Sequence, residues 1–114
     1  MAEIIPSENN GIYHLKLAGE IDAGSSVDLD QAINQGVRPE VRAIVIDCQT
    51  LEYISSAGLG VFMSYVEDFR EKNIRMILHS LNERVAHTFQ LLGLSDLLTI
   101  VPSQTEAEQI LHEN

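Results

Sequence analysis

The stretch that decides the fold is Leu51-Glu52-Tyr53-Ile54-Ser55-Ser56-Ala57-Gly58-Leu59-Gly60. It follows an apolar run at 41–47, which predicts a central β-strand covered on both faces, and it leads into the pattern of an amphipathic helix. Two adjacent hydroxyls therefore fall where a helix begins. A helix start exposes unpaired N–H groups and the positive end of the helix dipole, so it accommodates a phosphate. The same position calls for a cap, and a purely capping role for Ser55 or Ser56 is the simpler interpretation.

The segments on either side of this stretch predict an α/β fold. Hydrophobic periodicity and capping residues indicate strands at 12–18, 41–47, 74–79 and 97–101, and helices that begin near residues 22–26, 56, 82 and 104. The strand, helix and strand from residue 41 to 79 span ~40 residues and form a βαβ unit, whose two strands should be parallel. We expect one domain over residues 1–114, with a small mixed sheet and about four helices.

The same periodicity predicts which residues form the core. Ile44 and Ile46 should be among the most buried. The helices should contribute one apolar stripe each: Leu29, Ala32 and Ile33; Leu59, Phe62, Met63, Val66 and Phe69; Val85, Phe89 and Leu92; and Ala107, Ile110 and Leu111.

Composition excludes several classes of function. The chain has 114 residues and a formal net charge of −10, which argues against a nucleic-acid surface and against docking on anionic lipid. Cys48 is the only cysteine, so no internal disulfide forms. The sequence also lacks a signal peptide and an apolar membrane span, so we expect a cytoplasmic protein.

The residues carry little evidence of catalytic chemistry. The four histidines, His14, His79, His87 and His112, do not stand at metal-ligand spacings, and no cofactor is expected. The pair Gly58 and Gly60 lacks the rest of a nucleotide-binding motif and predicts close packing of a helix on the sheet.

Two carboxylates do lie in an informative place. Glu20 and Asp22 occupy a strand-to-helix turn that should lie at the same end of the sheet as Ser56, although Asp22 could equally be a helix cap. A hydroxyl at a helix start, beside an acid and without catalytic machinery, suits the substrate of a kinase better than an enzyme.

Three segments resemble the STAS domain, and specifically the stand-alone bacterial anti-sigma factor antagonists. They are Leu17-Ala18-Gly19-Glu20-Ile21-Asp22, Ile44-Val45-Ile46-Asp47-Cys48 and Tyr53-Ile54-Ser55-Ser56-Ala57-Gly58-Leu59-Gly60. The third resembles the family's switch segment, with two departures. The usual Asp before the phosphate acceptor is Ser55 here, and the usual Ser or Thr after it is Ala57.

The resemblance implies a partner switch. The unphosphorylated protein would bind an anti-sigma factor that is also a serine kinase, and phosphorylation would end the binding, with Ser56 as the favoured acceptor and Ser55 as the less favoured one. A PP2C-type phosphatase would reverse this. The partner-binding residues that the resemblance implies are Glu20, Asp22, Ser25, Ser55, Ser56, Ala57, Gly58, Leu59 and Gly60.

Two other functions stay open at this point. The domain could be a scaffold subunit of a transport or lipid-trafficking complex, because the fold alone does not separate the two roles. A small hydrolase that uses Ser56 is disfavoured, because the sequence shows neither a partnered base nor a Gly-x-Ser-x-Gly motif.

Overall fold

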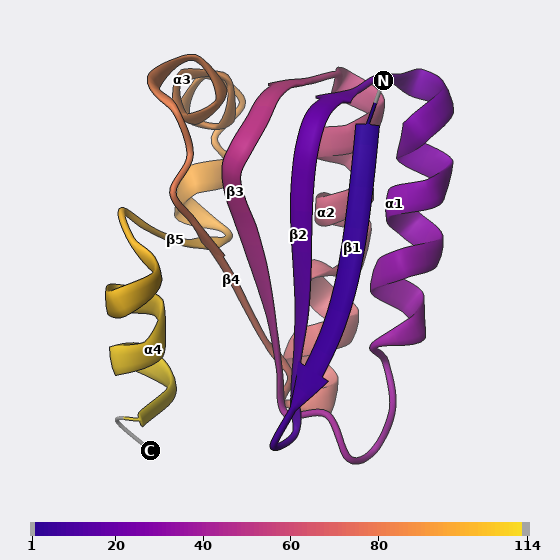
Figure 1. The fold of residues 1–114 in the computed structure, drawn as a ribbon, viewed down its shortest axis with the longest axis vertical. Helices are drawn as coiled ribbons and strands as arrows, with labels where there is room; N and C mark the ends of the chain where they lie inside the picture. Colours follow the sequence, from indigo (N-terminus) through magenta and orange to yellow (C-terminus); the bar gives the residue numbers. More distant parts are fainter. Residues whose placement is uncertain (1, 113–114) are drawn as a thin grey trace.

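The computed structural model describes residues 2–112, which form a five-stranded mixed sheet and four α-helices (Figure 1). The strands are β1 (Ala2–Asn9), β2 (Ile12–Ile21), β3 (Ala43–Ile54), β4 (Arg75–His79) and β5 (Thr99–Val101). The helices are α1 (Ala23–Gln35), α2 (Ser56–Lys72), α3 (Glu83–Leu91) and α4 (Gln104–His112), with a short 3₁₀ helix η1 (Leu94–Asp96) between α3 and β5.

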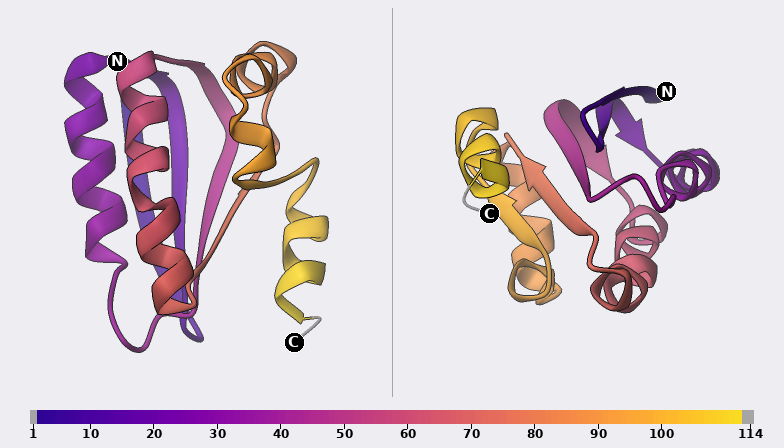
Figure 2. Two further views of the ribbon diagram at one scale, coloured as in Figure 1. Left: turned by 180° about the vertical axis from the view of Figure 1, so that it is seen from behind. Right: turned by 90° about the horizontal axis from the view of Figure 1, so that it is seen from below.

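The strands lie in sequence order, β1-β2-β3-β4-β5. The first pair is antiparallel and the other three are parallel, so the predicted mixed sheet and the parallel pairing of the β3-α2-β4 unit are confirmed. Helices α1 and α2 pack side by side on one face, and α4 lies on the other face over β3, β4 and β5 (Figure 2). The three parallel connections therefore bring the starts of α1, α2 and α3 to one end of the sheet (Figure 1).

Strand β1 was not predicted from the sequence. It forms a hairpin with β2 through a two-residue turn, Asn10-Gly11, in which both residues have positive φ, 54° and 79°. This is the backbone of a type I′ turn, and an Asn-Gly pair is a strong sequence signal for it. Pro6 lies in the middle of the strand, which an edge strand tolerates because one side makes no ladder bonds.

Strand β3 is longer than the predicted 41–47 segment and continues to Ile54. Its pairing with β2 shifts register twice, between Lys16 and Ala18 and again between Gly19 and Glu20. After Cys48 the buried side chains, Leu51 and Ile54, recur every third residue rather than every second. The alternation that marks a strand is therefore lost, because bulges insert extra residues.

The core has two parts, one on each face of the sheet. The larger lies under α1, α2 and α3 and contains Ile44, Ile46 and Phe62, each fully buried as predicted. The smaller lies under α4 and includes Val45 and Ile77. The continuous apolar run of β3 is thus explained by helices on both faces.

Two smaller predictions about the C-terminal half were wrong. Leu92 is 57% exposed rather than inward, because α3 ends one residue before it. The last strand begins at Thr99 and not at Leu97, which instead ends the 3₁₀ helix η1.

Candidate functional site at the start of helix α2

Ser55 is the cap of helix α2, and its hydroxyl and its main-chain N–H both have hydrogen-bond partners. Its hydroxyl oxygen accepts a hydrogen bond from the Gly58 N–H at 3.2 Å, and its own N–H donates to the Ile21 carbonyl at 2.8 Å. Its backbone is extended, and its side chain is half-buried. The hydroxyl of Ser55 thus caps the helix, and its N–H ties the start of the helix to the end of β2.

Ser56 is the first residue of α2 and differs from its neighbour in every one of these respects. It is exposed, and within residues 2–112 its hydroxyl has no hydrogen-bond partner. The capping alternative is therefore confirmed for Ser55 alone. Of the two hydroxyls, the one on Ser56 belongs to the more exposed residue and is not hydrogen-bonded within residues 2–112.

Asp22 caps helix α1 in the neighbouring turn. Its Oδ1 accepts hydrogen bonds from the Ser25 N–H at 2.8 Å and the Ser25 hydroxyl at 2.9 Å, while its own N–H donates to that hydroxyl oxygen at 2.8 Å. The Ser25 N–H, followed by the Ser25 hydroxyl, holds the pKa of the Asp22 carboxyl below its usual value. The possibility that Asp22 is a cap is confirmed.

The parallel register places the two helix starts together. Ile21 of β2 pairs with Ile54 of β3, and each is followed by the cap of the next helix, Asp22 and Ser55. Glu20 is exposed one residue before Ile21. The structure therefore brings the acidic turn and the serine pair to one end of the sheet, as the sequence predicted.

The two glycines of the Gly58-Leu59-Gly60 segment have different surroundings. A Cβ on Gly58 would lie 2.7 Å from Cγ1 of Ile54 and 2.9 Å from Cγ2 of Ile21, so only glycine lets α2 approach the sheet this closely. Leu59 is buried beside it. A Cβ on Gly60 would meet nothing within 4 Å, so the packing role predicted for this glycine is wrong.

Two exposed apolar side chains near this end were missed by sequence reasoning. Val27, in the first half of α1, is 57% exposed, and Tyr53, close to the end of β3, is 45% exposed. The sequence did hold a signal for Val27, because this apolar residue lies outside the inward stripe of α1.

Other kinds of site find little support in the described part of the chain. Residues 2–112 contain no group of three His, Cys, Asp or Glu side chains that could hold a metal ion. Within the same range, none of the helices is long and apolar enough to cross a membrane.

Comparison with known proteins places the chain in a family. The STAS domain model matches residues 3–107. The anti-sigma-B factor antagonist of Listeria monocytogenes is 32% identical over 84 residues, which are 74% of this chain and 74% of that protein.

The fold is shared with solved structures of more distant sequence. Unphosphorylated SpoIIAA, an anti-sigma factor antagonist, superposes with a TM-score of 0.82 at 18% identity and 98% coverage of both chains, and the phosphorylated Bacillus form with 0.74. The murine anion transporter Slc26a9 contains the same fold, with a TM-score of 0.77 at 12% identity over 95% of this chain and 19% of the transporter. The matches over most of its length show that this chain belongs to the STAS domain family and is related to the anti-sigma factor antagonists.

Proposed function

We propose that this chain is an anti-sigma factor antagonist that acts as a partner switch in the cytoplasm. Its unphosphorylated form binds an anti-sigma factor with serine kinase activity, and that kinase ends the binding by phosphorylating Ser56. A PP2C-type phosphatase restores the binding form. The chain itself supplies a docking surface and a hydroxyl, and it is not an enzyme.

The observation that carries this proposal is the contrast between the two serines. Ser55 is half-buried, and its oxygen already accepts the Gly58 N–H, so its phosphorylation would remove the cap of α2. Ser56 is exposed and free among the described residues, so its modification breaks no hydrogen bond of the fold.

The fold accommodates a phosphate at Ser56. Phosphoserine adds a charge of about −1.5 to −2. At the first residue of α2, the positive end of the helix dipole and the unpaired first-turn N–H groups offset part of that charge. We therefore expect the phosphorylated chain to keep its fold.

A docked partner does not accommodate the same group. Ala57 and Gly60 are exposed beside and one turn after Ser56, and their small side chains let a partner approach the helix closely. A dianion in such an interface must lose its water and is repelled by any carboxylate nearby. A loss of ~3 kcal/mol weakens binding by more than a hundredfold.

The alternative is a role as a scaffold subunit of a transport or lipid-trafficking complex. The fold supports it equally, because Slc26a9 contains the same architecture. The similarity at 32% identity to an anti-sigma-B factor antagonist, together with the free hydroxyl of Ser56, favours the switch.

The test is to incubate the purified protein with its cognate kinase and ATP–Mg²⁺ and to locate the phosphate by tandem mass spectrometry. The kinase supplies the catalytic base and holds the Mg²⁺. We expect one phosphate, on Ser56, in the wild-type protein and in Ser55→Ala, and none in Ser56→Ala. Phosphate on Ser55 instead would move the site and keep the mechanism. Failure of the kinase to modify either serine would favour the scaffold role.

A further inference from the structure

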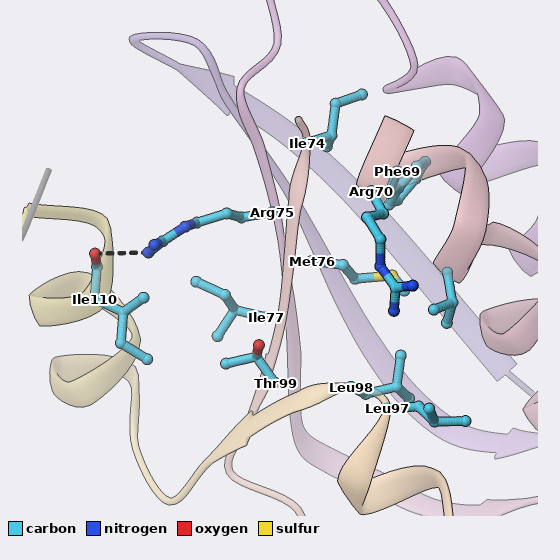
Figure 3. A pocket seen from close by; sticks show the side chains of 11 residues that line it. Phe69, Arg70, Ile74, Arg75, Met76, Ile77, Leu97, Leu98, Thr99 and Ile110 are labelled. Atoms are coloured by element: carbon cyan, nitrogen blue, oxygen red, sulfur yellow. Dashed lines mark hydrogen bonds between the residues drawn. The ribbon is translucent and has the colours of Figure 1, made fainter. Parts of the chain in front are cut away.

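A cleft of about 310 Å³ at the outer edge of β4 lacks a convergent set of ligand groups (Figure 3). Arg70 extends from α2 on one side of β4, and Arg75 extends on the other side, where it donates to the Ile110 carbonyl at 3.1 Å. The two guanidinium groups therefore do not meet around one ligand. The turn between β1 and β2 has more specific chemistry.

This turn contains an asparagine that is followed by a glycine. Of the six asparagines in the chain, Asn10 is the only one with glycine as the next residue. The next residue matters because its main-chain nitrogen is the atom that can attack the side-chain carbonyl carbon of the asparagine. Glycine has no Cβ to hinder that approach.

The turn leaves both reacting groups of this pair free. Asn10 is exposed, and within residues 2–112 neither its side-chain amide nor the Gly11 N–H has a hydrogen-bond partner. Asn82 differs in this respect. Its Oδ1 accepts the Val85 N–H at 2.8 Å, and its Nδ2 donates to the Leu51 carbonyl at 3.1 Å. The side chain of Asn82 is therefore held in place, whereas that of Asn10 can turn toward the main chain.

We propose that Asn10 deamidates spontaneously in the folded protein and that the isoaspartyl product loosens the β1–β2 hairpin. The Gly11 nitrogen gives up its proton and bonds to Cγ of Asn10. The Cγ–Nδ2 bond breaks, and the departing NH₂ group takes a proton and leaves as ammonia. Water then opens one of the two carbonyls of the resulting five-membered imide, which gives either aspartate or isoaspartate. Water is the only co-reactant.

The isoaspartyl product does not fit this turn. Its main chain runs through Cγ and is one carbon longer, whereas the hairpin is closed by two ordinary residues with positive φ. The turn is also close to the segment before β3. A Cβ on Gly11 would lie 3.1 Å from the Glu40 carbonyl oxygen, and the Gly11 carbonyl accepts the Arg42 N–H at 2.9 Å. A longer main chain at Asn10 should therefore weaken the pairing of β1 with β2.

The modification site is remote from the proposed phosphorylation switch. Strand β2 begins at Ile12, next to the turn, and ends at Ile21, beside Ser55. At 3.3 Å per residue, the two ends of the strand lie about 30 Å apart. Deamidation at Asn10 therefore does not depend on whether a kinase phosphorylates Ser56.

The test keeps the full native chain at body temperature for several days, at mildly alkaline and at mildly acidic pH. Peptide mapping by tandem mass spectrometry locates the exchange of NH₂ for OH, and an isoaspartyl methyltransferase with a labelled methyl donor measures isoaspartate. We expect the exchange at Asn10 well before Asn73, which is exposed but followed by Ile74, and before Asn82. It should be faster at alkaline pH, because the attacking nitrogen must lose its proton.

Asn10→Gly is the matched control, because a Gly-Gly pair also suits this type of turn. Circular dichroism checks its fold. Urea denaturation should show a loss of stability in the aged wild type and none in Asn10→Gly aged in the same way. An Asn10 that stays intact in the native chain but reacts in urea would overturn the proposal, and so would equal exchange at Asn73. Unchanged stability of the isoaspartyl protein would overturn the proposed effect on the hairpin.

Discussion

The main-chain N–H of Ser55 donates a 2.8 Å hydrogen bond to the carbonyl of Ile21. This bond joins the start of α2 to the end of β2, just beyond the last register pair of the two strands, Ile21↔Ile54. It sets the caps of α1 and α2, Asp22 and Ser55, next to each other at one end of the sheet. The exposed hydroxyl of Ser56 follows directly, so its position relative to the acidic turn is determined by strand pairing.

The first prediction concerns Ser56 in the proposed switch. Ser56→Ala should fold normally, resist phosphorylation and bind the anti-sigma partner constitutively. Ser56→Asp should fold but bind more weakly, by up to roughly a hundredfold for a loss of about 2.7 kcal/mol, although one carboxylate is a poor imitation of a dianion. Titration calorimetry with the purified partner measures the binding. Unchanged binding by Ser56→Asp, together with no modification by the kinase, would remove the basis of the switch.

The second prediction concerns Asp22. Because the carboxylate is hydrogen-bonded in the folded state, its pKa is lowered, so its contribution to stability is present at neutral pH and is lost as the pH falls through the folded-state pKa. Asp22→Ala should therefore melt at a lower temperature than the wild type at neutral pH, and the difference should shrink in acid. A matched control is Asp28→Ala, an exposed position further along α1.

Asp22→Ala should also impair partner binding or phosphorylation, because Asp22 and Ser55 directly follow the paired residues Ile21 and Ile54 at the same end of the sheet. Calorimetry and mass spectrometry on the folded variant check this. Loss of stability with normal binding and normal phosphorylation would leave Asp22 as a helix cap and no more.

The third prediction separates the two glycines of α2. Gly58→Ala places a Cβ within 3 Å of Ile54 and Ile21 and should destabilise the fold by about 1–3 kcal/mol. Gly60→Ala fills open space and should stabilise the helix by up to ~1 kcal/mol. Urea denaturation measures both free energies of unfolding. Shifts of the same sign in the two variants would show that α2 is packed differently.

The fourth prediction concerns the core. Ile46 and Phe62 are fully buried between the sheet and α2, so Ile46→Ala should lower the free energy of unfolding by ~2–5 kcal/mol and Phe62→Ala by ~3–5 kcal/mol. Thermal and chemical denaturation provide the values. An unchanged melting temperature for either variant would mean that this core is misplaced.

The fifth prediction concerns Cys48. Burial in the core, with a smaller effect from the Asp47 carboxylate, raises the pKa of its thiol well above its usual value. The thiol should therefore be almost inert to a disulfide reagent in the native protein and react quickly once urea unfolds the chain. Rapid reaction under native conditions would contradict its burial.

Sequence patterns that depend on local physics were predictive here. Capping by Asp22 and Asn82, the inward stripe of α2 and the apolar run of β3 follow from helix and strand periodicity, which neighbouring residues set among themselves. These elements sufficed for the βαβ unit and for the end of the sheet at which the hydroxyls lie.

Only the tertiary structure decided how far β3 extends and what each glycine and serine near the start of α2 contacts. Strand β3 continues past Asp47 because bulges in its pairing with β2 accommodate extra residues. The hydrophobic pattern of one strand does not reveal how that strand pairs with its neighbour. Gly58 and Gly60 look alike in sequence, yet one touches Ile21 and Ile54 and the other faces open space. The two serines also look alike in sequence, yet the hydroxyl of Ser55 is hydrogen-bonded to the Gly58 N–H and the hydroxyl of Ser56 is exposed. A hydroxyl is free or engaged according to which backbone groups the fold brings within 3.5 Å of it, and packing between distant segments sets that distance.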